Sequence, residues 1–353
     1  SNIGTYVGLV SDALPVGGDG AVYRPFVVND VQFRGGVVAF DAETGEERWR
    51  HVAPGYSRDT GWPTGIGAAV GTPAVGDGHL FVTSEAGTSD AEYGGLHALD
   101  SETGAISWAK TEESDDGEGD EHRWYGTPIL SGGTLYVARG GGPEATTVVA
   151  ALDPETGELQ WTTGGRPDVR LFGLADGTLY GTGATDGASR ELVAWGAVDG
   201  GVEWTTALDP GVDFADAADD TVYRSGSVEY DYSSSSFEGG PNEVVAHAAG
   251  DGSVRWRTTL TAEDEEPKGV LGAPAVADGT VYVHVRPRET RRATDYERGV
   301  LSTVYALDAA SGEVRWTHDT STALLGDPSV AVDTVYVGGH ALPKVEDEFS
   351  AVR

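Results

Sequence analysis

The chain has 353 residues, of which 39% are hydrophobic, so it can bury a large core. It carries 57 acidic and 23 basic residues, a net charge of −34, which argues against nucleic acid as a partner because phosphates need a basic surface. The absence of cysteine excludes disulfides, thiolate metal sites and a thiol nucleophile. No apolar run reaches the ~18 residues that indicate a membrane span.

The basic residues are strongly biased toward arginine. Only three of them are lysines, Lys110, Lys268 and Lys344, and the other 20 are arginines. A dense acidic surface with few lysines keeps a protein hydrated where salt screens charge, since the Debye length falls to about 3 Å at 1 M. The composition therefore predicts adaptation to high salt.

Taken in order, the chain repeats one pattern seven times. Each copy begins with a short strand, a tight turn that is usually Asp-Gly, and a second strand, as expected for hairpins in which glycine supplies a positive φ. The leading residue of the first strand stands eight residues before an aromatic of the second. These pairs are Pro15 with Tyr23, Pro73 with Phe81, Pro128 with Tyr136, Phe172 with Tyr180, Ala215 with Tyr223, Pro274 with Tyr282 and Pro328 with Tyr336.

The second half of each copy predicts a third strand, a turn and a fourth strand that ends in tryptophan. In residues 71–108, for example, strands are expected at 72–75, 79–83 and 96–99, followed by one that ends at Trp108. Trp195 has the same phase as Leu99 and is expected in the core. The recurring tryptophans are Trp49, Trp108, Trp161, Trp204, Trp256 and Trp316.

The two ends of the chain account for the missing seventh tryptophan. The copies span residues 8–49, 66–108, 122–161, 167–204, 210–256, 269–316 and 322–353, and the last of them stops in its third strand. Residues 3–8 place a Thr-Tyr-Val segment where a fourth strand is expected. We expect this N-terminal strand to complete the last copy, because ring closure leaves no open sheet edge.

The motif Pro-Ala-Val-x-Asp-Gly-x-Leu-Phe-Val, followed by Ala-Leu-Asp-x-x-Thr-Gly-x-x-x-Trp, resembles the PQQ-like repeat of the tryptophan-docking β-propellers. The resemblance covers essentially the whole chain. It implies an all-β, seven-bladed β-propeller of four-stranded antiparallel blades in a single domain, residues 1–353, with the six tryptophans packed between adjacent blades. Phe172, Ala215 and His247 depart from the pattern, so their two blades are expected to pack less regularly.

All long loops of such a meander are expected on one side of the disc, where binding residues usually lie. The segment 285–300 is unusual because it concentrates arginines in an acidic protein. These arginines either dock an acidic partner or are neutralised by nearby acids. Aromatic residues in the other loops either anchor a partner or a sugar, or fold the loops onto the disc. The candidate partner-binding face comprises Tyr56, Trp62, Trp124, Tyr125, Tyr230, Tyr232, Arg286, Arg288, Arg291 and Arg292.

The sequence offers little support for catalysis or metal binding. The acidic run 112–122 lacks the order of a calcium loop and is interpreted as a solvated loop. The histidines show no metal-ligand spacing. The recurring aspartates look catalytic in isolation, but their presence in successive copies favours turn capping. They are Asp41, Asp100, Asp153 and Asp308.

Two classes of function follow from the resemblance. The quinoprotein dehydrogenases imply PQQ, calcium, a catalytic aspartate and an adjacent cysteine pair, and this chain has no cysteine. The non-catalytic members, such as the lipoprotein scaffold of outer-membrane protein assembly, imply a binding platform without cofactor. We expect such a scaffold, monomeric and free of PQQ and calcium, that binds a protein or peptide partner; a glycan-binding module is a further alternative. Since the sequence starts with Ser1 and contains no methionine, we expect an extracytoplasmic or cell-surface protein of a high-salt organism.

Overall fold

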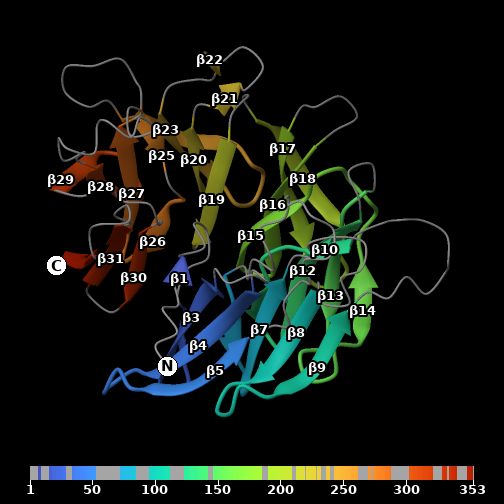
Figure 1. Cartoon of the computed structure of the whole chain (residues 1–353). Coiled ribbons are helices and arrows are strands. Elements are labelled where there is room, and N and C mark those ends of the chain that lie inside the picture. The colour runs from blue at the N-terminus through green and yellow to red at the C-terminus, as the bar shows by residue number, and fades with distance from the viewer. Residues whose placement is uncertain are drawn as a thin grey trace. The chain divides into compact units, whose positions relative to one another are not determined.

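The computed structural model describes the repeated strands and their short turns. The described residues are 7–8, 16–28, 34–52, 72–84, 95–111, 123–141, 146–184, 190–208, 212–218, 220–227, 229–231, 236–238, 242–260, 269–271, 273–287, 302–320, 328–331, 334–339 and 348–352. Every regular element among them is a β-strand (Figure 1), and the pairings are antiparallel. The predicted all-β class is confirmed. No helix in this part of the chain is long and apolar enough to cross a membrane.

The first three sheets follow the predicted order along the chain. Sheet 1 consists of β1 (Val7–Gly8), β2 (Val16–Gly18), β3 (Ala21–Val28), β4 (Arg34–Asp41) and β5 (Glu47–Val52). Sheet 2 consists of β6 (Ala74–Gly76), β7 (His79–Ser84), β8 (Gly95–Asp100) and β9 (Ile106–Thr111). Sheet 3 consists of β10 (Arg123–Tyr125), β11 (Ile129–Ser131), β12 (Thr134–Gly141), β13 (Val148–Leu152) and β14 (Leu159–Thr162).

Four further sheets and one hairpin follow. Sheet 4 consists of β15 (Arg170–Ala175), β16 (Thr178–Ala184), β17 (Arg190–Gly196) and β18 (Val202–Ala207). Sheet 5 consists of β19 (Val212–Ala218), β20 (Thr221–Ser227), β23 (Glu243–Ala248) and β24 (Val254–Thr259), and the hairpin of β21 (Glu229–Asp231) and β22 (Ser236–Glu238) interrupts it in sequence. Sheet 6 consists of β25 (Gly269–Leu271), β26 (Ala275–Ala277), β27 (Thr280–Pro287), β28 (Ser302–Asp308) and β29 (Val314–Thr320). Sheet 7 consists of β30 (Ser329–Ala331), β31 (Thr334–Gly339) and β32 (Glu348–Val352).

The predicted tight turns have the expected backbone. Asp77 has φ 54° and Gly78 has φ 76°, a left-handed pair that suits a two-residue hairpin. The turn between the third and fourth strands is longer than the first turn. It follows a β-bulge in the pairing of these two strands. In sheet 2 the register shifts between Ala98 and Leu99, and equivalent shifts recur in sheets 1, 3, 4, 5 and 6.

The predicted closure by residues 3–8 is wrong for Val7 and Gly8, the part of that segment that the structure describes. They pair with Val28 and Val27 of β3 in sheet 1, and not with sheet 7. The reason is that β3 is eight residues long and β2 pairs with only its first three, which leaves the far end of β3 open. The same split occurs on β12, shared by β10 and β11, and on β27, shared by β25 and β26.

The chain forms two compact units, and the division passes through sheet 4. One unit comprises Ser1–Leu171, Thr182–Asp186 and Ala197–Gly201, and the other comprises Phe172–Gly181, Gly187–Gly196 and Val202–Arg353. Within each unit, successive sheets bury apolar clusters between their faces, as between sheets 1 and 2 and between sheets 5 and 6. Trp195 is 1% exposed, which confirms its predicted place in the core.

Candidate functional site

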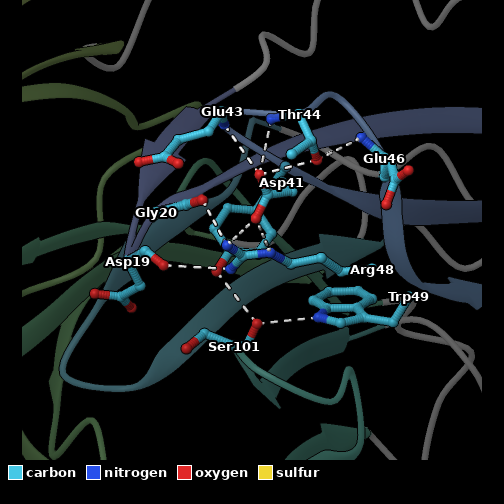
Figure 2. Close-up of polar contacts among 10 residues, drawn as sticks. Asp19, Gly20, Asp41, Glu43, Thr44, Glu46, Arg48, Trp49 and Ser101 are labelled. Atoms are coloured by element: carbon cyan, nitrogen blue, oxygen red, sulfur yellow. Dashed lines mark hydrogen bonds and ion pairs between the residues drawn. The ribbon is translucent and has the colours of Figure 1, made fainter.

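The turn between the third and fourth strands begins with an aspartate that caps it, and we call it the capped turn (Figure 2). In sheet 1, Asp41 Oδ1 accepts hydrogen bonds from Glu43 N at 3.1 Å, Thr44 N at 2.9 Å and Thr44 Oγ1 at 3.0 Å. Thr44 Oγ1 in turn accepts one from Glu46 N at 3.2 Å. This arrangement recurs at Asp100, Asp153 and Asp308.

In some of these turns an arginine forms an ion pair with the second carboxylate oxygen of the aspartate. Arg48 Nη2 lies 2.6 Å from Asp41 Oδ2 and also donates to Gly20 O at 2.8 Å, so it ties the two turns of sheet 1 together (Figure 2). Arg315 pairs with Asp308 in the same way in sheet 6. These hydrogen bonds hold the pKa of Asp41 well below its usual range and lower the pKa of Asp308 to about 2. Asp41 and Asp308 are therefore ionised, fully engaged turn residues, and neither is suited to proton transfer.

The recurring tryptophan connects one sheet to the capped turn of the next sheet. Trp49 Nε1 donates to Ser101 O at 3.0 Å (Figure 2). The hydroxyl of Tyr23 donates to the same oxygen at 3.3 Å. Tyr180 and Trp204 share Ala249 O in the same way, and Tyr223 and Trp256 share Ala309 O. In the other two junctions one such bond is described: Trp108 Nε1 donates to Pro154 O, and the hydroxyl of Tyr136 donates to Ala197 O.

The glycine of each receiving turn lies against the indole. A Cβ atom on Gly104 would come within 2.5 Å of Trp49 Cε3, and Gly104 also has φ 71°. Both facts require glycine at this position. The same indole contact is found for Gly157, Gly200, Gly252 and Gly312 against Trp108, Trp161, Trp204 and Trp256.

A further donor lies two residues beyond the tryptophan. Thr258 Oγ1 donates to Gly312 O at 2.7 Å, and Thr206 Oγ1 approaches Gly252 O at 3.4 Å. His51 fills this position in sheet 1, where it hydrogen-bonds the backbone of Gly104 and where burial lowers its pKa. The donor set that receives a turn therefore has up to three members: the tyrosine hydroxyl, the indole N–H and this third side chain.

Most of the predicted partner-binding face lies outside what the structure describes. For Trp124, Tyr230 and Arg286 only the backbone is described, in β10, β21 and β27. The residues that fall outside the described ranges altogether are Tyr56, Trp62, Tyr232, Arg288, Arg291 and Arg292.

Tyr125 was predicted to lie on the partner-binding face, but the structure places its ring in the core. It pairs with Arg139 across β10 and β12, and its side chain is only 7% exposed in the cluster shared by sheets 2 and 3. The cause is that β10 extends the first strand of sheet 3, so the ring joins Phe81 and Leu96 in the core instead of remaining in a loop.

Sheet 5 contains one partly buried carboxylate and one buried histidine that the sequence did not single out as functional. Asp216 Oδ1 accepts from Ala217 N at 2.8 Å, and the carboxylate also meets the backbone N–H of Val276 on sheet 6. Burial raises its pKa to about 6. His247 bonds Gly252 O through Nδ1 at 2.9 Å, and burial lowers its pKa. Alignment of the copies could have flagged Asp216, because a charged side chain is unexpected at that position.

No group of three or more histidine, aspartate or glutamate side chains is placed to hold a metal ion within the described ranges. The acidic run 112–122 falls outside those ranges, and so the interpretation of it as a solvated loop remains a prediction.

A family model described as outer membrane protein assembly factor BamB, of the PQQ-like repeat type, matches residues 33–170, 145–233 and 225–343. The chain belongs to this family. BamB from Moraxella catarrhalis is 17% identical, with a TM-score of 0.54 over 93% of this chain and 80% of that one. A europium-containing methanol dehydrogenase is 12% identical, with a TM-score of 0.56 over 95% of this chain and 76% of that one.

These structural likenesses establish a β-propeller fold and carry no function by themselves, because both identities are low. The serine/threonine-protein kinase AfsK of Streptomyces griseus is 39% identical over 101 residues, which are 28% of this chain and 11% of the kinase. The chain thus spans about a tenth of that curated relative. The number of blades stays a prediction.

Proposed function

We propose that this chain is a non-catalytic scaffold that binds a protein or peptide partner through the ends of the sheets that carry its long connections. The match to a family described as an assembly factor supports a scaffold over an enzyme. The arginines at 286–292 favour an acidic segment on the partner, since guanidinium groups pair bidentately with carboxylates.

The observation that carries this proposal is that the recurring side chains make structural contacts within and between the sheets. The aspartates hold turns, and the tyrosines and tryptophans dock one sheet on the next, so the repeated residues are committed to architecture. The turns between first and second strands, and the aspartate-capped turns between third and fourth strands, are both short in every sheet where they are described. The long connections join the opposite strand ends, and residues free to recognise a partner are expected there.

The alternative of a quinoprotein dehydrogenase finds no support in the residues of this chain. The adjacent cysteine pair that this resemblance implies is missing, since the chain contains no cysteine. We therefore propose that it functions without PQQ or calcium. Incubation with both, followed by a search for bound quinone absorbance, tests this directly, and retention of a stoichiometric quinone would contradict it.

Charge reversal on the two sides of the sheets tests the partner-binding face. The tagged chain is used at high salt to isolate its partner, and the interaction is then remeasured with the purified partner. Arg291→Glu with Arg292→Glu is expected to weaken binding at least ten-fold. The control is Arg255→Glu, on an exposed arginine paired with Asp220 beside the short turns, and it should leave binding unchanged. Equal binding by all three proteins would overturn the proposal.

Location and environment are part of the same proposal. The family description refers to outer-membrane protein assembly, which is consistent with a role outside the cytoplasm. The net charge of −34 supports a setting of high salt, where repulsion between surface carboxylates is screened.

A further inference from the structure

Two histidines lie in the contact between sheets 1 and 2. His51 of β5 stands opposite Val37 of β4, and His97 of β8 stands opposite Val82 of β7. Residues directly opposite one another in neighbouring strands share a face of the sheet. Val37 and Val82 belong to the same apolar cluster, which these two sheets bury between them. Each histidine is therefore directed from its own sheet into the contact with the other.

Both histidines are held in surroundings that disfavour a charge. His97 is only 9% exposed, and burial is the main cause that lowers its pKa. The positive charge that His51 can carry lowers it further. Burial also lowers the pKa of His51, although its hydrogen bond to the backbone of Gly104 acts in the opposite direction. A charge on His51 thus makes a charge on His97 less favourable, and the two rings titrate as a coupled pair.

No carboxylate faces the pair among the described residues around it. The facing titratable group from sheet 1 is Tyr23, whose hydroxyl is bound to Ser101 O. The other charged or titratable groups on the surrounding strands and in the capped turn of sheet 2 are exposed, engaged elsewhere or on the opposite faces of the sheets. They are Arg24, Asp41, Glu47, Arg48 and Arg50 of sheet 1, and His79, Asp100, Glu102 and Lys110 of sheet 2.

The contact between sheets 4 and 5 shows that docking does not require either histidine. Thr206 follows Trp204 by two residues, as His51 follows Trp49, and its hydroxyl approaches Gly252 O at 3.4 Å. Val245 of sheet 5 has the place of His97. Two titratable rings therefore occupy positions at which a hydroxyl and an apolar side chain serve the equivalent contact.

We propose that His51 and His97 form an acid-sensitive switch between sheets 1 and 2. At neutral pH both rings are uncharged, His51 bonds the backbone of Gly104, and the capped turn of sheet 2 stays docked on Trp49. In mildly acidic solution both rings take up a proton. Their mutual repulsion and their need for water then separate the turn from the indole. This switch does not depend on the proposed scaffold function.

The direction of the switch follows from the lowered pKa of both histidines. In an open contact each ring returns toward the ordinary pKa of 6.5, so it binds a proton more readily than in the closed contact. The closed contact has its full stability above about pH 6.5 and loses it as the pH falls below this value. Asp216, between sheets 5 and 6, responds in the opposite sense because its pKa is raised. That contact is therefore an internal control.

The absence of cysteine lets a single introduced thiol report on the opening of the contact. Val82→Cys places a buried thiol opposite His97, and Val281→Cys places a matched buried thiol between sheets 5 and 6. Both full chains are labelled with 4,4′-dithiodipyridine in 2 M KCl at pH 5 and pH 7.5. The rate for Val82→Cys, divided by the rate for Val281→Cys, should be about ten-fold higher at pH 5, since one pKa unit is ten-fold in an equilibrium.

Other copies of the repeat supply conservative variants of the two histidines. His51→Thr and His97→Val introduce the residues that the contact between sheets 4 and 5 uses at these places. In the Val82→Cys chain, this double variant should have the same relative labelling rate at both pH values. The control is His79→Gln, on the other face of sheet 2 beside Phe81, which should keep the ten-fold difference.

A histidine titration followed by NMR tests the pair without relying on the double variant. His51→Thr should raise the pKa of His97, because it removes the neighbouring positive charge. Thermal melting at pH 7.5 checks that each variant is folded. An equal relative labelling rate at both pH values in the parent Val82→Cys chain would overturn the proposal. So would acceleration at pH 5 that persists in the folded double variant, or a pKa of His97 that His51→Thr leaves unchanged.

Discussion

At the scale of single residues, Asp216 is the clearest exception to the repeat. The same position holds small or apolar residues in the other copies: Val16, Ala74, Ile129, Gly173, Ala275 and Ser329. Its carboxylate faces sheet 6, where β26 contributes only Ala275, Val276 and Ala277. With desolvation larger than the effect of its two backbone hydrogen bonds, the folded protein favours the protonated form.

The raised pKa of Asp216 leads to a pH-dependent effect of mutation. Because the pKa rises from 3.8 to about 6 on folding, the unfolded chain ionises first as the pH increases, and stability is lost between about pH 4 and pH 6. Two pKa units correspond to roughly 3 kcal/mol. Asp216→Asn keeps an oxygen for Ala217 N and Val276 N, and it should raise the free energy of unfolding by up to that amount at pH 8. It should have little effect at pH 4. Urea unfolding at both pH values measures this, and an equal change at both would contradict it.

At the scale of elements, the contact between an indole and a turn decides which glycines are irreplaceable. Gly104 and Gly133 have nearly the same backbone, with φ 71° and φ 74°. They differ in surroundings, since a Cβ on Gly104 meets Trp49 and one on Gly133 has nothing within 4 Å.

The pair of substitutions Gly104→Ala and Gly133→Ala therefore separates backbone strain from loss of docking. Both should lose about 1–2 kcal/mol from the left-handed conformation. Gly104→Ala should lose a further 1–3 kcal/mol or so, because the methyl group displaces the indole. Denaturant unfolding of the two variants tests this, and equal losses would show that the indole adjusts freely.

The sequence predicted the elements well wherever the copies repeat. Strands expected at 79–83 and 96–99 are found at His79–Ser84 and Gly95–Asp100, because alternation and glycine turns are local signals. The N-terminal pairing was mispredicted, since periodicity does not choose between the open end of β3 and the edge of sheet 7. The hairpin Glu229–Asp231 with Ser236–Glu238 was missed because it occurs in one copy only.

The candidate site was less predictable than the strands, for a physical reason. The turn-capping role of Asp41 followed from its recurrence, but partner residues do not recur. Their placement depends on which end of a strand is extended: Tyr125 became a core residue only because β10 lengthens the first strand of sheet 3.

At the scale of the whole molecule, charge is the dominant feature. The net charge of −34 is spread over many exposed carboxylates, including Glu43, Glu102 and Glu155 in the capped turns. Ion pairs such as Arg48 with Asp41 neutralise some of them, but the chain has just 23 basic residues for 57 acids. Repulsion among the remaining charges opposes the compact state, and salt screens it.

Stability should therefore rise with ionic strength. The melting temperature is expected to increase by several degrees between 0.1 M and 2 M KCl, since the Debye length falls from about 10 Å to below 3 Å. A variant with Glu43→Gln, Glu102→Gln and Glu155→Gln removes three exposed charges without removing the capping aspartates, so it should gain stability mainly at low salt and show a shallower dependence. Sucrose at matched osmolality controls for effects of solute exclusion, which do not depend on charge. The prediction would be contradicted by a melting temperature that is the same at both salt concentrations. It would also be contradicted if the triple variant had the same salt dependence of the melting temperature as the parent chain, because the surface carboxylates would then not be the cause.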